Sequence, residues 1–234
     1  MITPSYILRK LDHLFHPAKG VVLMLHRVTK MPLYDSKNAP YSISPQRLEQ
    51  AILDYRARGY RFVSIDEVVD MVTAHHFGQP FVCFTLDDGY RDNLLEAAPV
   101  FRRYDVPFCI FVATDYMGMN KPDYVMMTES ELREIAKDPL CTIGAHTISH
   151  CRLSQQTHVE KERQIRESGK TLRSMGVGPV SHFAYPYGDM DIECAKIVEQ
   201  CGYRSAVMAW NGSIRSNNTL YQLPRQALVD QYNN

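Results

Sequence analysis

The chain has no long apolar segment, no excess of charge of one sign and only one tryptophan. Its 234 residues include 26 Lys and Arg against 26 Asp and Glu, so the formal net charge is zero. Proteins whose main partner is nucleic acid usually carry a basic excess or stripe, and this balance argues against such a partner. The longest apolar runs, at residues 21–25 and 108–113, are far shorter than the ~20 residues of a membrane-spanning helix. With 45% hydrophobic and 22% charged residues, the composition is typical of a folded globular protein.

A secretory signal and a cysteine framework are also missing. Arg9, Lys10 and Asp12 interrupt the stretch that would form the apolar part of a signal, and no small-residue cleavage site follows. The six cysteines lack CxxC spacing, and three of them lie in apolar runs. We interpret them as reduced thiols and expect the protein to be cytoplasmic or to lie at the inner membrane surface.

Residues 1–20 have the spacing of a short amphipathic helix, with apolar side chains from Ile7 to Phe15 separated by charged ones. Two interpretations remain open for this helix. It is either a flap that packs on the domain or a basic helix that rests on an anionic membrane surface. We expect one further domain, over residues 21–234, because no repeat, linker or low-complexity stretch divides that part of the chain.

Short apolar runs alternate with helical patterns from residue 21 onward. Ser44 before Pro45 marks one helix start, and Asp66 is predicted to cap the next helix. Such alternation implies parallel strands joined by right-handed crossovers. Seven or eight units in about 210 residues favour a distorted (β/α) barrel of about seven to eight parallel strands over an open sheet. The predicted strands are residues 21–25, 62–65, 81–86, 108–113, 141–144, 182–185, 204–209 and 221–228.

Acidic and histidine side chains follow two of these strands. Asp87 and Asp88 come directly after residues 81–86, and two adjacent carboxylates are costly unless a cation or proton relieves them. Alternatively, Asp88 caps a helix and Asp87 is a turn residue. His146 and His150 follow residues 141–144 at a spacing that one helical turn would direct to one point, although such pairs are often solvated or buried without a metal. One carboxylate and two imidazoles together indicate a catalytic metal site with open positions.

Two weaker signals follow other strands. Pro186 and Gly188 favour a tight turn that would direct the backbone N–H of Tyr187 into a site as an oxyanion donor, although an ordinary turn fits equally. His26 ends the run at residues 21–25, and a single histidine there proves little.

Together these residues resemble the polysaccharide deacetylases of carbohydrate esterase family 4. Residues 85–89, Thr-Leu-Asp-Asp-Gly, are similar to the Thr-Phe-Asp-Asp-Gly motif of that family. Residues 146–150, His-Thr-Ile-Ser-His, are similar to its His-(Ser/Thr)-x-x-His motif. Residues 184–188, Ala-Tyr-Pro-Tyr-Gly, are similar to its Arg-x-Pro-Tyr-Gly motif. The resemblance covers roughly residues 20–228 and implies the same distorted barrel.

The resemblance implies a role for each of these side chains. Asp88, His146 and His150 would bind a divalent metal, Asp87 would be the general base, and the Tyr187 backbone N–H would stabilise the oxyanion. Zinc is the metal expected for this ligand set, and cobalt, nickel or manganese would fit the same ligands.

The sequence departs from the usual motif order in two respects. The family's general acid is a histidine in a late Leu-x-His motif, but no histidine follows His182 here. Some members are circularly permuted, and Leu25-His26 resembles the displaced motif, so His26 is the expected general acid. Ala184 stands where the motif often has an arginine that orients the base, and Arg225 is the best substitute unless it is a solvated strand-end arginine.

The resemblance implies a metal-dependent hydrolase that removes N-acetyl groups from an amino-sugar glycan or glycoconjugate and releases acetate. Tyr187 and Trp210 would contact the substrate, although Trp210 fits a core or rim position equally well. The alternatives are an O-acetyl esterase, a deacetylase of a small amide, or a catalytically silent glycan-binding module that keeps the metal. In each of these alternatives the expected partner is an acetylated glycan or a small amide. Nucleic acid is not an expected partner.

Overall fold

The structure is a computed structural model that describes residues 16–30, 42–121 and 124–229. Most of the amphipathic helix predicted at residues 1–20 lies outside the described residues. Residues 16–19 have no regular structure, and Gly20 begins the first strand. The division of the chain at residue 20 therefore stays a prediction.

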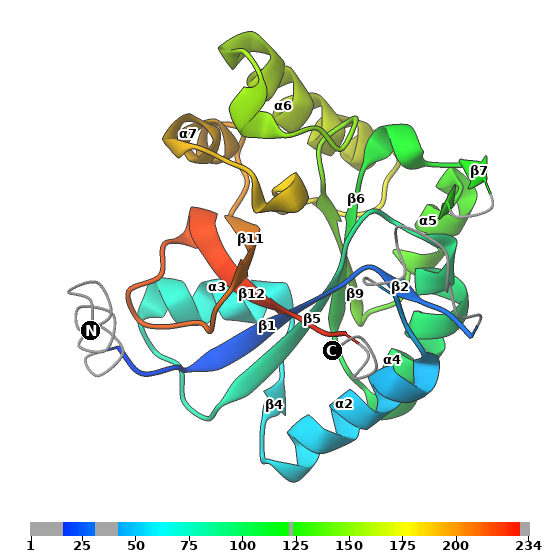
Figure 1. Ribbon diagram of the computed structural model, residues 1–234, viewed down its shortest axis with the longest axis vertical. Helices are drawn as coiled ribbons and strands as arrows, with labels where there is room; N and C mark the ends of the chain where they lie inside the picture. The colour runs from blue at the N-terminus through cyan, green and yellow to red at the C-terminus, as the bar shows by residue number, and fades with distance from the viewer. Residues whose placement is uncertain (1–15, 31–41, 122–123, 230–234) are drawn as a thin grey trace, which may run out of the picture.

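Within the described residues, seven parallel strands close into a barrel with helices around it, as the alternating pattern predicts (Figure 1). Strand β5 (Phe81–Leu86) closes the ring by pairing with β1 (Gly20–Leu25) along its whole length. Strand β12 (Leu223–Ala227) pairs with the other edge of β1. In ring order the strands are β1 (Gly20–Leu25), β5 (Phe81–Leu86), β6 (Phe108–Val112), β9 (Cys141–Ala145), β10 (His182–Ala184), β11 (Ser205–Asn211) and β12 (Leu223–Ala227).

Strand β4 (Arg61–Phe62) lies outside the ring and shares one edge of β5 with β6. The strand predicted at residues 62–65 is thus too long, because Ile65 already belongs to helix α3 (Ile65–Ala74). Ser64 caps that helix and forms a capping box with Glu67, so the prediction of Asp66 as the cap is wrong. Two short pairs complete the strands: β2 (Arg27–Val28) with β3 (Ser42–Ile43), and β7 (Asn120–Lys121) with β8 (Tyr124–Val125).

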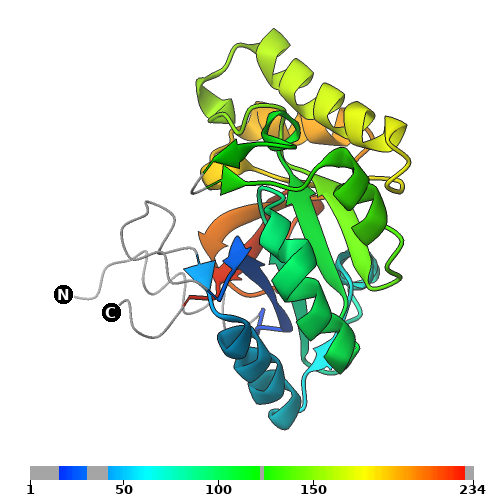
Figure 2. The same cartoon turned by 90° about the vertical axis from the view of Figure 1, so that its right-hand side faces the viewer.

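The helices surround the strands, and the view turned by 90° shows them outside the barrel (Figure 2). They are α2 (Pro45–Ala57), α3 (Ile65–Ala74), a π-helical turn η2 (Asn93–Ala97) that continues into α4 (Ala98–Tyr104), α5 (Glu129–Ile135), α6 (His158–Ser174) and α7 (Ile192–Gln200). Short 3-10 turns are η3 (Thr114–Tyr116), η4 (Leu153–Gln155), η5 (Pro186–Gly188) and η6 (Leu220–Gln222). Ser44 caps α2 ahead of Pro45, as predicted. None of the described helices has the length and apolar composition to cross a membrane.

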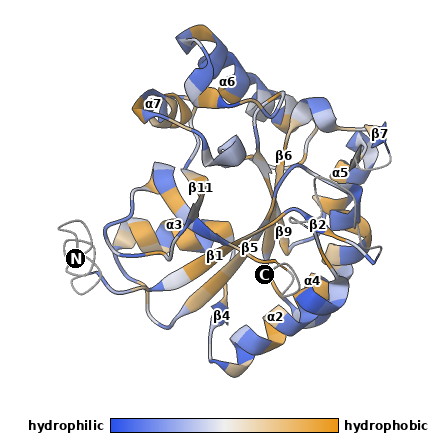
Figure 3. Ribbon diagram, viewed as in Figure 1, coloured by the Kyte–Doolittle hydropathy of each residue, from blue (hydrophilic) through white to orange (hydrophobic). Residues whose placement is uncertain are grey.

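The strand residues form most of the hydrophobic core, because one face of each strand lies in the barrel interior and the other is covered by helices. Every residue of β1, β5 and β6 is buried, and the hydropathy colours show apolar strands inside helices with polar outer faces (Figure 3). The ring of Phe101 in α4 stacks on Phe108 at the start of β6, with centroids 4.6 Å apart. All six cysteines are free thiols. With the strands fixed in this way, chemistry-bearing side chains just beyond their carboxyl ends meet in one place.

Candidate active site

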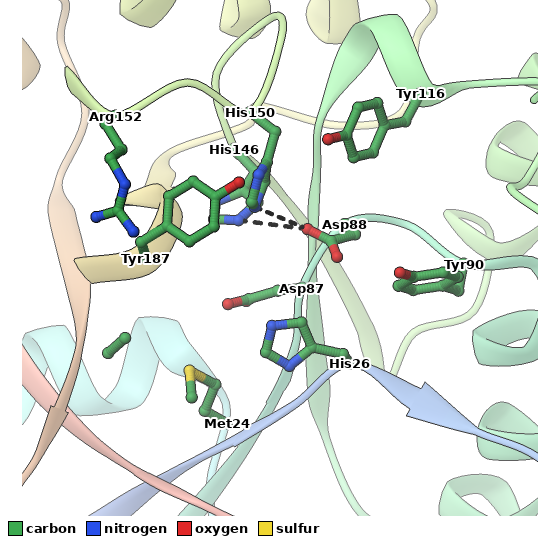
Figure 4. A pocket seen from close by; sticks show the side chains of 11 residues that line it. Met24, His26, Asp87, Asp88, Tyr90, Tyr116, His146, His150, Arg152 and Tyr187 are labelled. Atoms are coloured by element: carbon green, nitrogen blue, oxygen red, sulfur yellow. Dashed lines mark ion pairs between the residues drawn. The ribbon is translucent and has the colours of Figure 1, made fainter. Parts of the chain in front are cut away.

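One pocket of about 530 Å³ opens at the carboxyl ends of the strands. Most of its residues come from the segments after β1, β5, β6, β9 and β10, and two belong to β1 and β11 themselves. Figure 4 shows their side chains converging around Asp87 and Asp88. The lining residues are Met24, His26, Asp87, Asp88, Tyr90, Tyr116, His146, His150, Arg152, Tyr187 and Ala209. The pocket thus brings together most of the side chains singled out from the sequence.

Asp88, His146 and His150 have the geometry of a metal site. Oδ1 of Asp88 lies 3.2 Å from Nε2 of His150 and 3.5 Å from Nε2 of His146. Ligands of a tetrahedral ion at about 2.0–2.1 Å would be roughly 3.3 Å apart. Oδ1 is buried and has no well-formed hydrogen bond to any described residue. A buried oxygen without a hydrogen bond, facing two imidazole nitrogens, fits a divalent cation.

Asp88 lies on a tight turn that directs it into the pocket. Asp88 and Gly89 both have left-handed backbone angles, with φ of 75° and 86°. A Cβ at position 89 would approach Val112 to 3.2 Å in addition to this strain. Burial acts to raise the pKa of Asp88, but the neighbouring imidazoles, His150 foremost, hold that pKa below its ordinary value. The carboxylate is therefore ionised and ready to bind a cation.

The two histidines lie on a loop, so the single helical turn predicted for them is wrong. Thr147 and His150 have positive φ angles of 66° and 54°, which an α-helix does not allow. The side chain of Gln164 on α6 accepts hydrogen bonds from the backbone N–H groups of Ile148 (2.9 Å) and Ser149 (3.0 Å). The imidazoles converge because α6 supports this loop from outside.

The ring of His146 is oriented by a backbone group. Its Nδ1 lies 2.8 Å from the carbonyl oxygen of Ala184. Because a carbonyl oxygen can only accept, the ring proton must be on Nδ1, and Nε2 is free to bind a metal. Burial lowers the pKa of His146 to about 4, so the imidazole is neutral at neutral pH. Position 184, where an arginine is expected from the motif, contributes its carbonyl group to the site.

Arg225 holds Asp87 with two parallel hydrogen bonds. Its Nη1 and Nη2 donate to the two carboxylate oxygens at 2.8 and 2.7 Å. The same guanidinium donates to the hydroxyl of Thr85 (3.0 Å) and the carbonyl oxygen of Met208 (2.7 Å). Arg225 is only 1% exposed, which contradicts the alternative of a solvated strand-end arginine. Burial acts to raise the pKa of Asp87, but the Arg225 charge outweighs it and holds that pKa well below its usual range.

His26 follows β1 and lines the same pocket, on the other side of Asp87 from the two metal-site histidines in Figure 4. The carbonyl oxygen of His26 accepts a hydrogen bond of 2.9 Å from the side chain of Asn93, which is fully buried. Asp92 beside it accepts from the side chain of Arg27 at 2.8 Å and from the backbone of Val28 at 3.3 Å. These bonds join the loop after β1 to the helical turn that follows Asp87 and Asp88.

Tyr187 occupies the predicted tight turn, with φ of 60° and ψ of 7°. Gly188 follows with φ of 65°, and a Cβ there would lie 2.8 Å from the backbone nitrogen of Ala209. Tyr187 is 55% exposed, and its ring meets that of His150 edge to face, with centroids 4.6 Å apart. Trp210 lies on β11, but its side chain is outside what the structure describes. The predicted roles of both residues stay predictions.

Sequence reasoning missed several pocket residues. Tyr90, Tyr116 and Arg152 line the site but were not singled out. Tyr90 follows the acidic pair by two residues and Arg152 follows His150 by two, so nearness to a motif was the available signal. Tyr116 has no such signal, because it is distant from the motifs in the sequence. The pairing of β6 with β9 brings it to the pocket.

Comparison with known proteins gives one consistent family. A model described as polysaccharide deacetylase matches residues 74–206. YxkH of Bacillus subtilis, provisionally named a polysaccharide deacetylase, is 26% identical over 210 residues, which are 89% of this chain and 71% of that protein. The poly-β-1,6-N-acetyl-D-glucosamine N-deacetylase of Staphylococcus aureus is 22% identical over 199 residues, covering 81% of this chain and 69% of the relative. The structure of the Streptococcus pyogenes deacetylase PplD in complex with acetate superposes with a TM-score of 0.80 at 22% identity, over 89% of this chain and 92% of that one.

Proposed function

Because the chain belongs to the polysaccharide deacetylase family, we propose that it is a metal-dependent hydrolase that removes N-acetyl groups from an amino-sugar glycan. The observation that carries this proposal is an ionised, arginine-bound carboxylate, Asp87, beside three convergent metal-binding groups. The relative named as a poly-β-1,6-N-acetyl-D-glucosamine N-deacetylase supports an N-acetylated glucosamine polymer as the substrate class.

Asp88, His146 and His150 would hold the divalent metal, because their ligand atoms lie within 4.8 Å of one another. One carboxylate and two imidazoles suit zinc first, and cobalt, nickel or manganese would fit as well. When bound, the metal supplies a Lewis acid that polarises the acetamide carbonyl group and lowers the pKa of water in the site. The carbonyl oxygen of Ala184 holds the ring of His146 in the required tautomer.

Asp87 would act as the general base and take a proton from the attacking water. Arg225 bonds to both carboxylate oxygens, but each oxygen keeps a further lone pair for the proton. The arginine also fixes the plane of the carboxylate and keeps it ionised. The pocket opens on Asp87, so substrate and water have access to it.

His26 would act as the general acid. Attack on the amide carbon gives a tetrahedral intermediate that collapses only when the nitrogen of the sugar receives a proton, and His26 lines the pocket beside Asp87. The backbone N–H of Tyr187 would donate to the oxyanion of that intermediate. The products are acetate and a free amine on the sugar.

The test is acetate release from N-acetylglucosamine oligomers by zinc- or cobalt-loaded protein, with O-acetylated sugars as a second panel. We expect release from the N-acetyl substrates and loss of release after treatment with a chelator. Faster release from O-acetyl sugars would favour an esterase. Oligomer binding without acetate release from either panel would favour a glycan-binding module and contradict the proposal.

A further inference from the structure

Arg152 lies at the rim of the pocket, two residues after the metal-site residue His150. Its guanidinium carbon is 4.4 Å from the centroid of the Tyr187 ring, and that ring meets His150 edge to face. One aromatic ring therefore separates the Arg152 charge from the metal site. Figure 4 shows Arg152 beside Tyr187, on the side of the pocket away from Tyr90 and Tyr116.

The Arg152 guanidinium differs from those of the other described arginines, because it makes neither a hydrogen bond nor an ion pair within the described part of the chain. Every other arginine there does so, such as Arg163 with Glu160 or Arg173 with the carbonyl oxygen of Val180. A guanidinium is always charged and carries five N–H donors in a planar fork. As far as the described residues go, none of these five donors has an acceptor in the protein, so they can serve a ligand that enters the pocket.

The backbone around Arg152 is fixed. Its carbonyl oxygen accepts hydrogen bonds from the backbone of Gln155 (3.3 Å) and the side chain of Gln156 (3.1 Å). The hydroxyl and the backbone N–H of Ser154 both donate to Asp189, at 2.8 and 3.0 Å, which ties this loop to the Tyr187 turn. The backbone positions of Arg152 and Tyr187 are thus set relative to each other before any ligand binds, which lowers the entropic cost of binding.

The acidic groups nearby do not balance the Arg152 charge. Asp87 is bonded to Arg225, Asp88 faces the metal-site histidines, and Asp189 accepts from Ser154. An anion at the rim would therefore meet one uncompensated positive charge next to an exposed tyrosine face, on which a sugar ring can pack.

We propose that Arg152 forms a subsite for an oxyanion, a carboxylate or a phosphate, on the sugar next to the one that loses its acetyl group. This inference rests on the proposed deacetylase function and narrows its substrate to acidic N-acetylated glycans. Arg152 is a specificity residue in this account, because it would contact a group remote from the reacting bond.

The test compares neutral and acidic oligomers of equal length with zinc-loaded protein. The neutral probe is an N-acetylglucosamine hexamer. The acidic probes are a hyaluronan hexasaccharide, with a carboxylate on every second sugar, and an N-acetylglucosamine hexamer carrying 6-phosphate groups. We expect one or both acidic probes to have at least about tenfold higher kcat/KM than the neutral one. Arg152→Gln should lower that ratio about tenfold, and Arg152→Lys should lower it less.

Arg166→Gln is the matched control, because Arg166 is an exposed arginine on α6 that pairs with Glu162 outside the pocket. This variant should keep the wild-type ratio. Equal rates on neutral and acidic probes, or a ratio that Arg152→Gln leaves unchanged, would overturn the subsite while leaving the deacetylase function intact.

Binding of the same oligomers by calorimetry separates the two proposals. If no probe releases acetate but an acidic oligomer binds more tightly than the neutral one, and Arg152→Gln removes the difference, the deacetylase function fails and the subsite stands. If acidic and neutral oligomers bind equally and neither is deacetylated, both proposals fail.

Discussion

Replacement of Arg225 by methionine should affect stability and turnover together. Arg225 and Asp87 form a buried pair, with side-chain exposures of 0% and 3%. The Arg225→Met variant leaves the Asp87 carboxylate inside the protein without its counter-charge. It also removes the donors that serve the Thr85 hydroxyl and the Met208 carbonyl oxygen.

The expected loss of stability is about 3–5 kcal/mol, because breaking a buried ion pair from one side leaves an uncompensated charge. The pKa of Asp87 should rise, since burial then acts without the opposing arginine. Wild-type stability from this pair is complete above the ordinary aspartate pKa and is lost as the pH falls toward the lowered folded value. In the variant, the carboxylate takes up a proton at higher pH and loses the two hydrogen bonds that orient it. The acidic limb of kcat/KM should therefore move to higher pH and the plateau should fall, by at most about the 10²–10⁴-fold that a general base contributes.

Urea denaturation at pH 7 measures the first effect, and the pH profile of acetate release measures the second. The control is Arg166→Met, which breaks an exposed i,i+4 pair on α6 and should cost about 0.3–0.5 kcal/mol. Arg225→Lys keeps one charge and should recover part of the activity, with the acidic limb of its profile between those of the wild type and Arg225→Met. An Arg225→Met protein within about 1 kcal/mol of the wild type, with an unshifted acidic limb, would refute the reasoning.

Two further perturbations test the neighbouring groups. Burial lowers the pKa of His146 from its ordinary value to about 4. At a pH between these two pKa values, the unfolded chain therefore binds more protons at this residue than the folded protein does. Metal-free protein should therefore lose about 3 kcal/mol of stability at this residue as the pH falls from 7 to 4, and His146→Gln should flatten that part of the urea-denaturation profile; parallel profiles would contradict the shift. Asn93→Ala removes the hydrogen bond to the His26 carbonyl oxygen and should lower kcat about tenfold with little change in KM, because His26 acts in the chemical step. Steady-state kinetics with an unchanged kcat would show that Asn93 does not position the acid.

The barrel could be predicted because its strands are buried on both faces and so form short apolar runs at regular intervals. Residues 81–86 are a strand over that whole range, and Ser44 with Pro45 marks the start of α2. Sequence signals for a helix start were less reliable where two possible capping residues lie close together. Ser64 and Asp66 both suit a helix cap, and the capping box with Glu67 favours Ser64.

The parts of the site that could not be predicted depend on contacts distant in the sequence. The conformation of the loop at residues 146–150 depends on Gln164, and its histidine spacing alone is equally compatible with a helix. The contact between Arg225 and Asp87 exists because β1 pairs with both β12 and β5 and so brings the last strand toward the acidic pair. Arg152 has no motif of its own, and only the structure shows that its guanidinium packs on Tyr187 without a hydrogen bond or ion pair to the described residues.

The central claim is that Asp87 performs chemistry beside a metal that other residues hold. The most direct test is to measure the metal content and the acetate release of Asp87→Asn in parallel with His146→Ala. We expect Asp87→Asn to retain one divalent ion and to lose at least about 10²-fold in kcat, and His146→Ala to lose the ion. An Asp87→Asn protein that retains its metal and releases acetate at the wild-type rate would contradict the account.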